Sequence, residues 1–274
     1  MHGIEHIAAG NGFTLVAARD GLYGCGTTAR GQLGIQGRDT LLSMTQIPLP
    51  RPAARITDLS AGMDHVLLLQ DASVFATGLN TDGQLAKPAV IPYATQFTHV
   101  ALPEGVLPTR VIAGGDTSMV LTSSGNVFVW GNTEYGQALQ AATVDQLRTP
   151  TEVDVGISVV DACLGGSFLL FLDDCGTLHT AGYGAIGYEA PSTMLLRPLA
   201  LPEKVTCIAA GLDYAAAATD AGNVYVWGIV HGEPGDTHLC PEHVAVPFDG
   251  TRPRRITDLA CARGALLVLG EKHL

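Results

Sequence analysis

The feature that most constrains the fold is a repeat of short apolar segments, each of which ends in a small residue and a glycine. Successive copies of this glycine lie 52, 52, 51 and 46 residues apart, and a sixth copy carries arginine after a further 52 residues. A period of about 50 residues indicates a repeat architecture in which each unit is one supersecondary motif. The positions are Gly10, Gly62, Gly114, Gly165, Gly211 and Arg263.

A second series of glycines keeps the same period, and each of them follows an apolar or aromatic segment. These are Gly26, Gly78, Gly131, Gly182 and Gly228. Five residues past each of the first four comes another glycine, at Gly31, Gly83, Gly136 and Gly187. Glutamine follows three of these, at Gln32, Gln84 and Gln137. Because two independent series of glycines keep the same period, the repeat is not a chance similarity.

Each unit is a set of short apolar runs separated by turn residues, such as Asp20-Gly21 and Ser124-Gly125-Asn126. Asp, Asn and Gly provide the local hydrogen bonds and the positive φ that tight hairpins require. Prolines gather between the units, as at Pro48, Pro50 and Pro52. The pattern predicts an all-β fold, a β-propeller of four-stranded blades whose apolar faces pack against one another.

The complete pattern resembles the regulator-of-chromosome-condensation repeat, which runs Ala-Gly, a His-Thr-like pair, Asp-Gly, an aromatic residue, Trp-Gly and Gly-Gln-Leu-Gly. Trp130 and Trp227 match its tryptophan and His65 its histidine. We expect the two tryptophans to pack between blades and not to stack on a ligand. The resemblance implies one propeller domain over residues 1–274, with units of approximately 4–55, 56–107, 108–158, 159–204 and 205–255 and a partial unit 256–274.

The number of units raises the question of how the ring closes, because family members usually have seven blades. In this family a sequence unit straddles two blades, so we expect five blades and a two-stranded remainder at the N-terminal end. Three alternatives stay open. The ring closes with about five to six blades, a partner subunit or second copy completes it, or the chain is a fragment of a longer one.

The loop after Ala-Gly carries aspartate at the same offset in three units, at Asp64, Asp116 and Asp213, and His65 follows the first of them. Equal offsets in a propeller place equivalent residues on one rim. The resemblance implies a role for such residues in releasing nucleotide from a Ran-type GTPase. The alternative, which we favour, is that each aspartate accepts hydrogen bonds within its own tight loop.

One segment of the fifth unit is rich in residues that can bind zinc. It contains His231, His238, Cys240 and His243. Four such side chains arranged as a tetrahedron form a structural zinc site. Their spacing fits no established zinc template, so we favour an irregular loop without metal.

The composition excludes several classes of protein. With 15 Lys+Arg against 26 Asp+Glu and a net charge of −11, direct binding to nucleic acid is not expected. An apolar fraction of 47% with 15% charged residues argues against disorder. No apolar run reaches the length of about 20 residues that a membrane span requires. The six cysteines form no Cys-x-x-Cys pair and no secretory signal opens the chain, so we expect an intracellular protein, cytoplasmic or nuclear.

The sequence contains no phosphate-cradling loop and no Gly-x-Ser-x-Gly or His-Glu-x-x-His motif, so we expect no enzymatic activity and no cofactor. The leading hypothesis is a protein–protein interaction propeller that acts as a scaffold or an assembly subunit. The alternative is a guanine-nucleotide exchange factor or regulator of a Ran-like small GTPase. A secreted inhibitor or lectin-like propeller is disfavoured by the missing signal and the unpaired cysteines.

Overall fold

The computed structural model of the chain describes residues 3–139, 144–190, 192–229, 237–246, 255–263 and 265–271. All regular secondary structure in these residues is β-strand, and no helix among them has the length and apolar character needed to cross a membrane. The chain divides into two compact units, which are described one at a time. The first contains strands β1 to β12, and the second contains residues 135–139 and strands β13 to β22.

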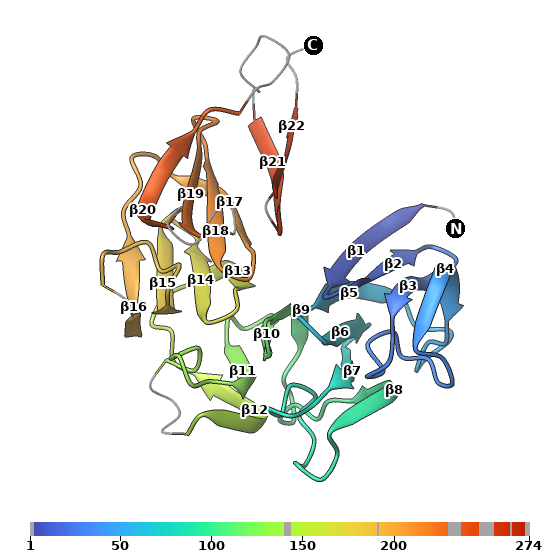
Figure 1. Cartoon of the computed structure of the whole chain (residues 1–274). Coiled ribbons are helices and arrows are strands. Elements are labelled where there is room, and N and C mark those ends of the chain that lie inside the picture. Colours follow the sequence, from blue (N-terminus) through green and yellow to red (C-terminus); the bar gives the residue numbers. More distant parts are fainter. Residues whose placement is uncertain are drawn as a thin grey trace. The chain divides into compact units, whose positions relative to one another are not determined.

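The first unit consists of three four-stranded sheets, coloured blue to green in Figure 1. In each sheet the strands lie side by side in chain order and every neighbouring pair is antiparallel. The strands are β1 (Ile4–Gly10), β2 (Phe13–Ala18), β3 (Gly21–Thr27) and β4 (Thr40–Ile47); β5 (Ile56–Ala61), β6 (His65–Gln70), β7 (Ser73–Leu79) and β8 (Tyr93–His99); and β9 (Pro108–Gly114), β10 (Thr117–Thr122), β11 (Val127–Asn132) and β12 (Gln146–Val153).

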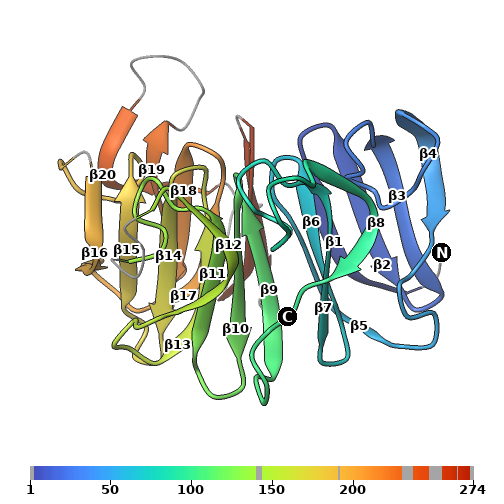
Figure 2. The same ribbon diagram turned by 90° about the horizontal axis from the view of Figure 1, so that it is seen from below.

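The second unit contains two more four-stranded sheets of the same kind and one two-stranded sheet, and Figure 2 shows the four-stranded sheets from below. Its strands are β13 (Val159–Leu164), β14 (Phe168–Asp173), β15 (Leu178–Tyr183) and β16 (Ser192–Leu199); β17 (Val205–Ala210), β18 (Tyr214–Thr219), β19 (Val224–Ile229) and β20 (Thr237–Val244); and β21 (Arg255–Ala262) with β22 (Ala265–Glu271). The all-β, propeller-like fold that the repeat predicts is therefore confirmed, with five four-stranded sheets and a partial sixth.

The glycine of the Trp-Gly motif is required by a close approach of two backbones. Gly78 and Gly131 are the penultimate residues of the third strands of their sheets and have φ of +104° and +98°. A Cβ on Gly78 would lie 2.3 Å from the carbonyl oxygen of Asp64. The pairing with the fourth strand shifts register at both glycines, so each one forms the bulge at which the chain leaves the sheet.

Sheets within a unit are held together by apolar side chains that project from facing strands. In the first unit, Leu15 and Leu22 of the first sheet share a buried cluster with Ile56, Leu59 and Leu68 of the second. The second and third sheets share another. In the second unit, the fourth and fifth sheets form a cluster that contains Trp227. Trp130 and Trp227 are both fully buried, as expected of packing residues.

Two expectations about the repeat were wrong. A sequence unit does not straddle two sheets: β1 to β4 all fall within the first unit of the repeat, and the two-stranded remainder, β21 and β22, lies at the C-terminal end. The reason is that the connection after the fourth strand, not the Ala-Gly turn, carries the chain to the next sheet. How the ring closes stays a prediction.

The second correction concerns Gly187, which is not the counterpart of Gly31, Gly83 and Gly136. Gly184 has φ of +82°, close to +80° at Gly31 and +93° at Gly83. Ile186, two residues later, is buried at 0% exposure, as are the leucines of the Gly-Gln-Leu loops. The spacing from the glycine near the end of the third strand to this glycine is three residues shorter than in the other loops, so Ala185 takes the place of the glutamine.

Candidate functional site

The Gly-Gln loops join the third strand of a sheet to the fourth, and each one folds its glutamine back over its own backbone. Oε1 of Gln32 accepts a hydrogen bond of 3.0 Å from the Arg30 N–H, and Oε1 of Gln84 accepts one of 2.9 Å from the Asp82 N–H. Both glutamine side chains are buried. Their Nε2 groups are thereby held in one orientation.

In the first unit these glutamines donate to the aspartates that follow Ala-Gly in the next sheet. Nε2 of Gln32 donates to Oδ1 of Asp64, and Nε2 of Gln84 donates to Oδ1 of Asp116, each at 2.9 Å. We call these two contacts the Gln–Asp bridges. Hydrogen bonds to a carboxylate are among the stronger ones in proteins. Each bridge therefore fastens one sheet to the next at the rim where the Gly-Gln loops lie.

The first bridge also includes a cation. Nη1 of Arg30 lies 3.2 Å from Oδ2 of Asp64, whose side chain is 12% exposed. Asp116 forms no ion pair with a residue that the structure describes; burial raises the pKa of Asp116, while the hydrogen bond from Gln84 opposes that shift. Asp64 and Asp116 thus accept from the Gly-Gln loop of the preceding sheet, so the expectation that each aspartate bonds within its own tight loop is wrong for these two.

His65 lies inside the protein, in a network that joins the second and third sheets. Its Nε2 is 2.9 Å from Oγ of Ser118, which donates in turn to the Gln84 carbonyl oxygen at 2.8 Å. Nε1 of Trp130 donates to the same carbonyl at 2.8 Å. Because the single serine proton goes to the carbonyl, His65 donates from Nε2. Burial lowers the pKa of His65 from 6.5 to about 4, so the ring is neutral.

Asp213, the third aspartate at this offset, has a different environment in the second unit. Its side chain is exposed, and its carboxylate has no hydrogen-bond or ion-pair partner among the described residues. The preceding loop has Ala185 where the first unit has glutamine. The tryptophan contact is nevertheless kept, since Nε1 of Trp227 donates to the Ala185 carbonyl oxygen at 2.9 Å.

The Gln137 loop has the glutamine but lacks the aspartate partner. Oε1 of Gln137 accepts from the Tyr135 N–H at 3.0 Å, as in the two sister loops. Its side chain is 1% exposed, and Nε2 has no hydrogen-bond partner among the described residues. The residue at the aspartate position is Ser167. The second unit thus contains a donor without a carboxylate and a carboxylate without a donor.

Exposed apolar side chains replace polar ones on the corresponding rim of the second unit. Tyr135 packs against Tyr183, with ring centroids 5.9 Å apart, and Gly136 backs onto Met194. Further along the same rim lies Leu212, whose carbonyl oxygen accepts from the Gly166 N–H at 2.8 Å. The exposed fraction of each of the four apolar residues exceeds one-third; they are Tyr135, Tyr183, Met194 and Leu212.

The same positions of the first unit are polar and mutually bonded. Asp82, the counterpart of Tyr135, accepts from Nε2 of Gln146 at 2.8 Å. Arg148, the counterpart of Met194, donates to the carbonyl oxygens of Asn80 and Thr81 at 3.3 and 2.7 Å. Such a rim satisfies its own polar groups.

The candidate zinc residues are not gathered in the part of the chain that the structure describes. His231 lies outside the described residues. Nδ1 of His238 is paired with Glu242 at 2.8 Å, while His243 packs edge-on against Tyr225. Cys240 is exposed. Among the described residues, the group of three potential ligands that comes together is Asp173, Asp174 and Cys175, in an exposed turn.

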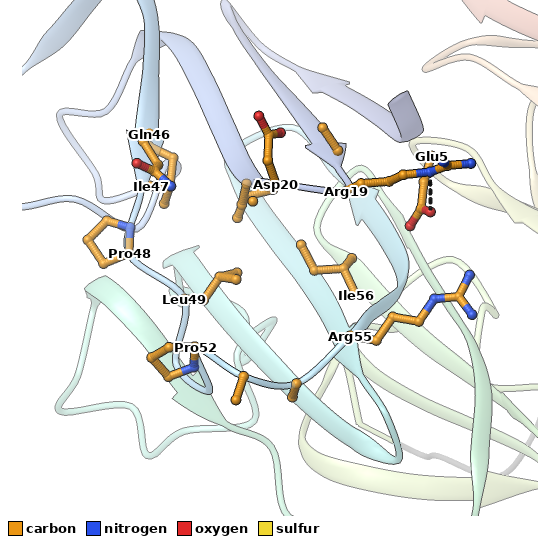
Figure 3. Close-up of a pocket in the computed structure, with 15 residues that line it drawn as sticks. Glu5, Arg19, Asp20, Gln46, Ile47, Pro48, Leu49, Pro52, Arg55 and Ile56 are labelled. Atoms are coloured by element: carbon orange, nitrogen blue, oxygen red, sulfur yellow. Dashed lines mark ion pairs between the residues drawn. The ribbon is translucent and has the colours of Figure 1, made fainter. Parts of the chain in front are cut away.

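A pocket of about 680 Å³ lies in the first unit, between the turn after β2 and the connection from β4 to β5 (Figure 3). Nε of Arg19 pairs with Oε1 of Glu5 at 3.8 Å, and Asp20 and Arg55 add one charge of each sign. No histidine, cysteine, serine, threonine or lysine occurs among the lining residues. The pocket therefore holds no nucleophile or general base other than carboxylates.

The repeat indicated the aspartates as rim residues but not their glutamine partners. A usable signal was present: Gln32 and Asp64 are 32 residues apart, as are Gln84 and Asp116. When two polar residues keep the same separation in two copies of the repeat, that spacing indicates a contact between neighbouring copies.

Comparisons with known proteins agree with the repeat. The family model described as "Regulator of chromosome condensation (RCC1) repeat" matches residues 110–137. The mouse "RCC1-like G exchanging factor-like protein" is 27% identical over 296 residues, covering 99% of this chain and 63% of that protein. The bovine "Secretion-regulating guanine nucleotide exchange factor" is 31% identical over 213 residues, covering 74% of this chain and 45% of that protein. The chain thus spans less than two-thirds of the length of either relative.

Solved structures show the same fold. The crystal structure of human WBSCR16 superposes with a TM-score of 0.75 at 21% identity, covering 100% of this chain and 88% of that one. Yeast RCC1 (Prp20), solved bound to Kap60, superposes with a TM-score of 0.77 at 18% identity, covering 97% of this chain and 68% of that one.

Proposed function

Because the chain belongs to the family of regulator-of-chromosome-condensation repeat proteins, we propose that it forms propeller blades of a regulator that promotes guanine-nucleotide exchange on a small GTPase. The observation that carries this proposal is the similarity to two sets of relatives that are named as exchange factors and are 25% to 31% identical to this chain. The scaffold hypothesis thus becomes the second candidate.

An exchange factor needs no covalent chemistry. It accelerates release because it binds the nucleotide-free GTPase more tightly than the nucleotide-bound form. The residues required are surface groups that contact the GTPase and are not already engaged in holding the propeller together.

This requirement separates the three rim aspartates. Asp64 and Asp116 are engaged in the Gln–Asp bridges, and His65 is buried. Asp213 is exposed and its carboxylate has no partner among the described residues. In the proposed exchange factor, Asp213 is therefore the rim carboxylate that contacts the GTPase.

The test is release of a fluorescent GDP analogue from a panel of purified small GTPases that starts with a Ran-like one. We expect this protein to accelerate release from at least one of them, and Asp213→Ala to weaken that acceleration about tenfold, the effect of losing one hydrogen bond to a charged group. Asp220→Ala is the matched control, since Asp220 is an exposed aspartate in the β18–β19 turn of the same sheet. Unchanged release from every GTPase at micromolar protein would contradict the proposal.

The second candidate, a docking propeller without exchange activity, is favoured by the exposed apolar rim of the second unit. Tyr183, Met194 and Leu212 are 51%, 57% and 47% exposed. A stable complex with a protein that is not a GTPase, together with unchanged nucleotide release, would favour this candidate.

A further inference from the structure

The Gln137 loop contains a buried amide group that is oriented but unbonded. Tyr135 N–H holds Oε1 of Gln137 at 3.0 Å, so the side chain cannot simply turn over without losing that bond. Nε2 is shielded from solvent and has no partner among the described residues. Leaving a buried donor unsatisfied costs free energy, so this group favours any acceptor that reaches it.

The two sister loops show which acceptor fits. Gln32 and Gln84 have the same backbone contact at Oε1, and in both cases Nε2 donates to a carboxylate at 2.9 Å. At the third position Ser167 replaces the aspartate, and a serine side chain carries a hydroxyl in place of the carboxylate, so it is shorter and uncharged. Ser167 is held in its turn by its backbone, because its carbonyl oxygen accepts from the Tyr183 N–H at 2.8 Å.

The surroundings of Gln137 favour a protein segment over a free inorganic anion. In the first bridge Arg30 adds a positive charge next to the carboxylate, but its counterpart here is Tyr135. Tyr135, Tyr183 and Met194 form an apolar surface beside the loop and are 37%, 51% and 57% exposed. We call these three residues the Tyr–Met surface. Phosphate would lack the cation that Arg30 provides in the first bridge, whereas an apolar side chain next to a carboxylate has the exposed Tyr–Met surface to cover.

We propose that Gln137 and the Tyr–Met surface bind an acidic side chain of a partner protein, an aspartate or glutamate flanked by an apolar residue. Because Nε2 of Gln137 is covered in the free protein, the side chains over it move aside on binding. The partner's carboxylate then takes the position that Asp64 and Asp116 occupy in the two bridges, and it accepts from Nε2 of Gln137 beside Ser167. The apolar neighbour covers Tyr135, Tyr183 and Met194. This site does not depend on nucleotide exchange, because any partner protein that presents such a segment can bind to it.

The probe is the capped peptide acetyl-Gly-Leu-Asp-Phe-Gly-amide, titrated into the ¹⁵N-labelled full chain, with the peptide that has Asn in place of Asp as its control. The readout is the side-chain amide signal of Gln137, assigned by its absence from Gln137→Met. We expect the aspartate peptide to shift this signal and to bind about tenfold more tightly than the asparagine peptide, as expected when a charged acceptor replaces a neutral one. Equal binding of the two peptides would overturn the proposal.

A second variant tests the position of the carboxylate. Ser167→Asp provides an internal carboxylate like that of the two bridges, so it raises the thermal midpoint of the protein and weakens binding of the aspartate peptide about tenfold. Ser167→Asn controls for side-chain size without the charge. If Ser167→Asp bound the aspartate peptide as well as the unmodified chain does, the assignment of this position would be wrong.

Discussion

The rims of the two units are built on the same loops but differ in how their polar groups are satisfied. In the first unit, Gln32 and Gln84 each donate to a carboxylate of the next sheet. Among the described residues of the second unit, Gln137 has no carboxylate partner and Asp213 has no glutamine. The repeat therefore preserves the fold of the loop independently of the bridge, and loss of one partner leaves the other polar group without its hydrogen bond.

The largest difference that we predict is in acid sensitivity. His65 is buried and neutral in the first unit, whereas Phe168 and Tyr214 occupy its position in the second. The pKa of His65 is lowered from 6.5 to about 4. As the pH falls, His65 takes up a proton in the unfolded state before it does so in the folded state. The contribution of neutral His65 to the free energy of unfolding is therefore fully present above pH 6.5 and is lost as the pH falls to about 4.

The loss in the free energy of unfolding that is attributable to His65 is about 3 kcal/mol, because one pKa unit corresponds to about 1.36 kcal/mol. Urea unfolding of the unmodified protein and of His65→Phe at several pH values between about 4 and 7 measures this loss. The variant should lack most of the pH dependence of the first unit over this range. The raised pKa of Asp116 acts in the opposite direction, since that group contributes stability at low pH that is lost as the pH rises. Identical pH profiles for the two proteins would show that His65 is not the titrating group.

The next prediction compares two equivalent glutamines. Gln84→Met removes the donor to Asp116 and leaves a half-buried carboxylate unpaired, so we expect a loss of about 1.5–3 kcal/mol in the free energy of unfolding. Gln137→Met removes an amide whose Nε2 has no partner among the described residues, so the variant loses the bond that Oε1 accepts from the Tyr135 N–H but no bond to a carboxylate. Methionine is close to glutamine in shape, and we expect a smaller loss of about 0.5–1 kcal/mol.

Urea denaturation followed by tryptophan fluorescence distinguishes these two variants, because Trp130 donates to the Gln84 loop. Equal losses in Gln84→Met and Gln137→Met would contradict the difference between the two units.

A smaller gain is expected from restoring a bridge in the second unit. Ala185→Gln places a glutamine where the fourth loop lacks one, opposite Asp213. We expect a stabilisation of about 0.5–1 kcal/mol, less than the loss in Gln84→Met, because Asp213 is exposed and ordering the new side chain costs entropy. Differential scanning calorimetry measures it, and the double variant Ala185→Gln with Asp213→Ala should cancel the gain.

The smallest effect concerns the last residue of the Gly-Gln-Leu-Gly motif. Ala86 has φ of +53°, a conformation that Gly34 adopts at the same position of the first loop. Ala86→Gly relieves the strain of this conformation but makes the unfolded chain more flexible. We expect a net stabilisation of a few tenths of a kcal/mol, measured by urea unfolding. A clear destabilisation would mean that the Ala86 methyl group contributes more by packing than the conformation costs.

Much of the fold could be predicted from the sequence. The two glycine series located the turns and bulges, because Gly78 and Gly131 lie where a Cβ would collide with another backbone. The buried tryptophans and the four-stranded sheets were predicted as well. The boundaries of the sheets were not predicted, and neither was Gly184 as the counterpart of Gly31 and Gly83. The fourth loop keeps the conformation of the others, but its glycine follows the preceding one at a spacing that is three residues shorter.

Sequence by itself determined the repeat, the alternation of short strands and turns, and the shared position of the three aspartates, because all of these are local properties that recur with a fixed period. The tertiary structure alone decided which polar groups are satisfied. Asp64, Asp116 and Asp213 are equivalent in sequence, but two are bonded to a glutamine 32 residues earlier and one is not. The physical reason is that a hydrogen bond between sheets depends on both partners being present, and each partner belongs to a different unit of the repeat.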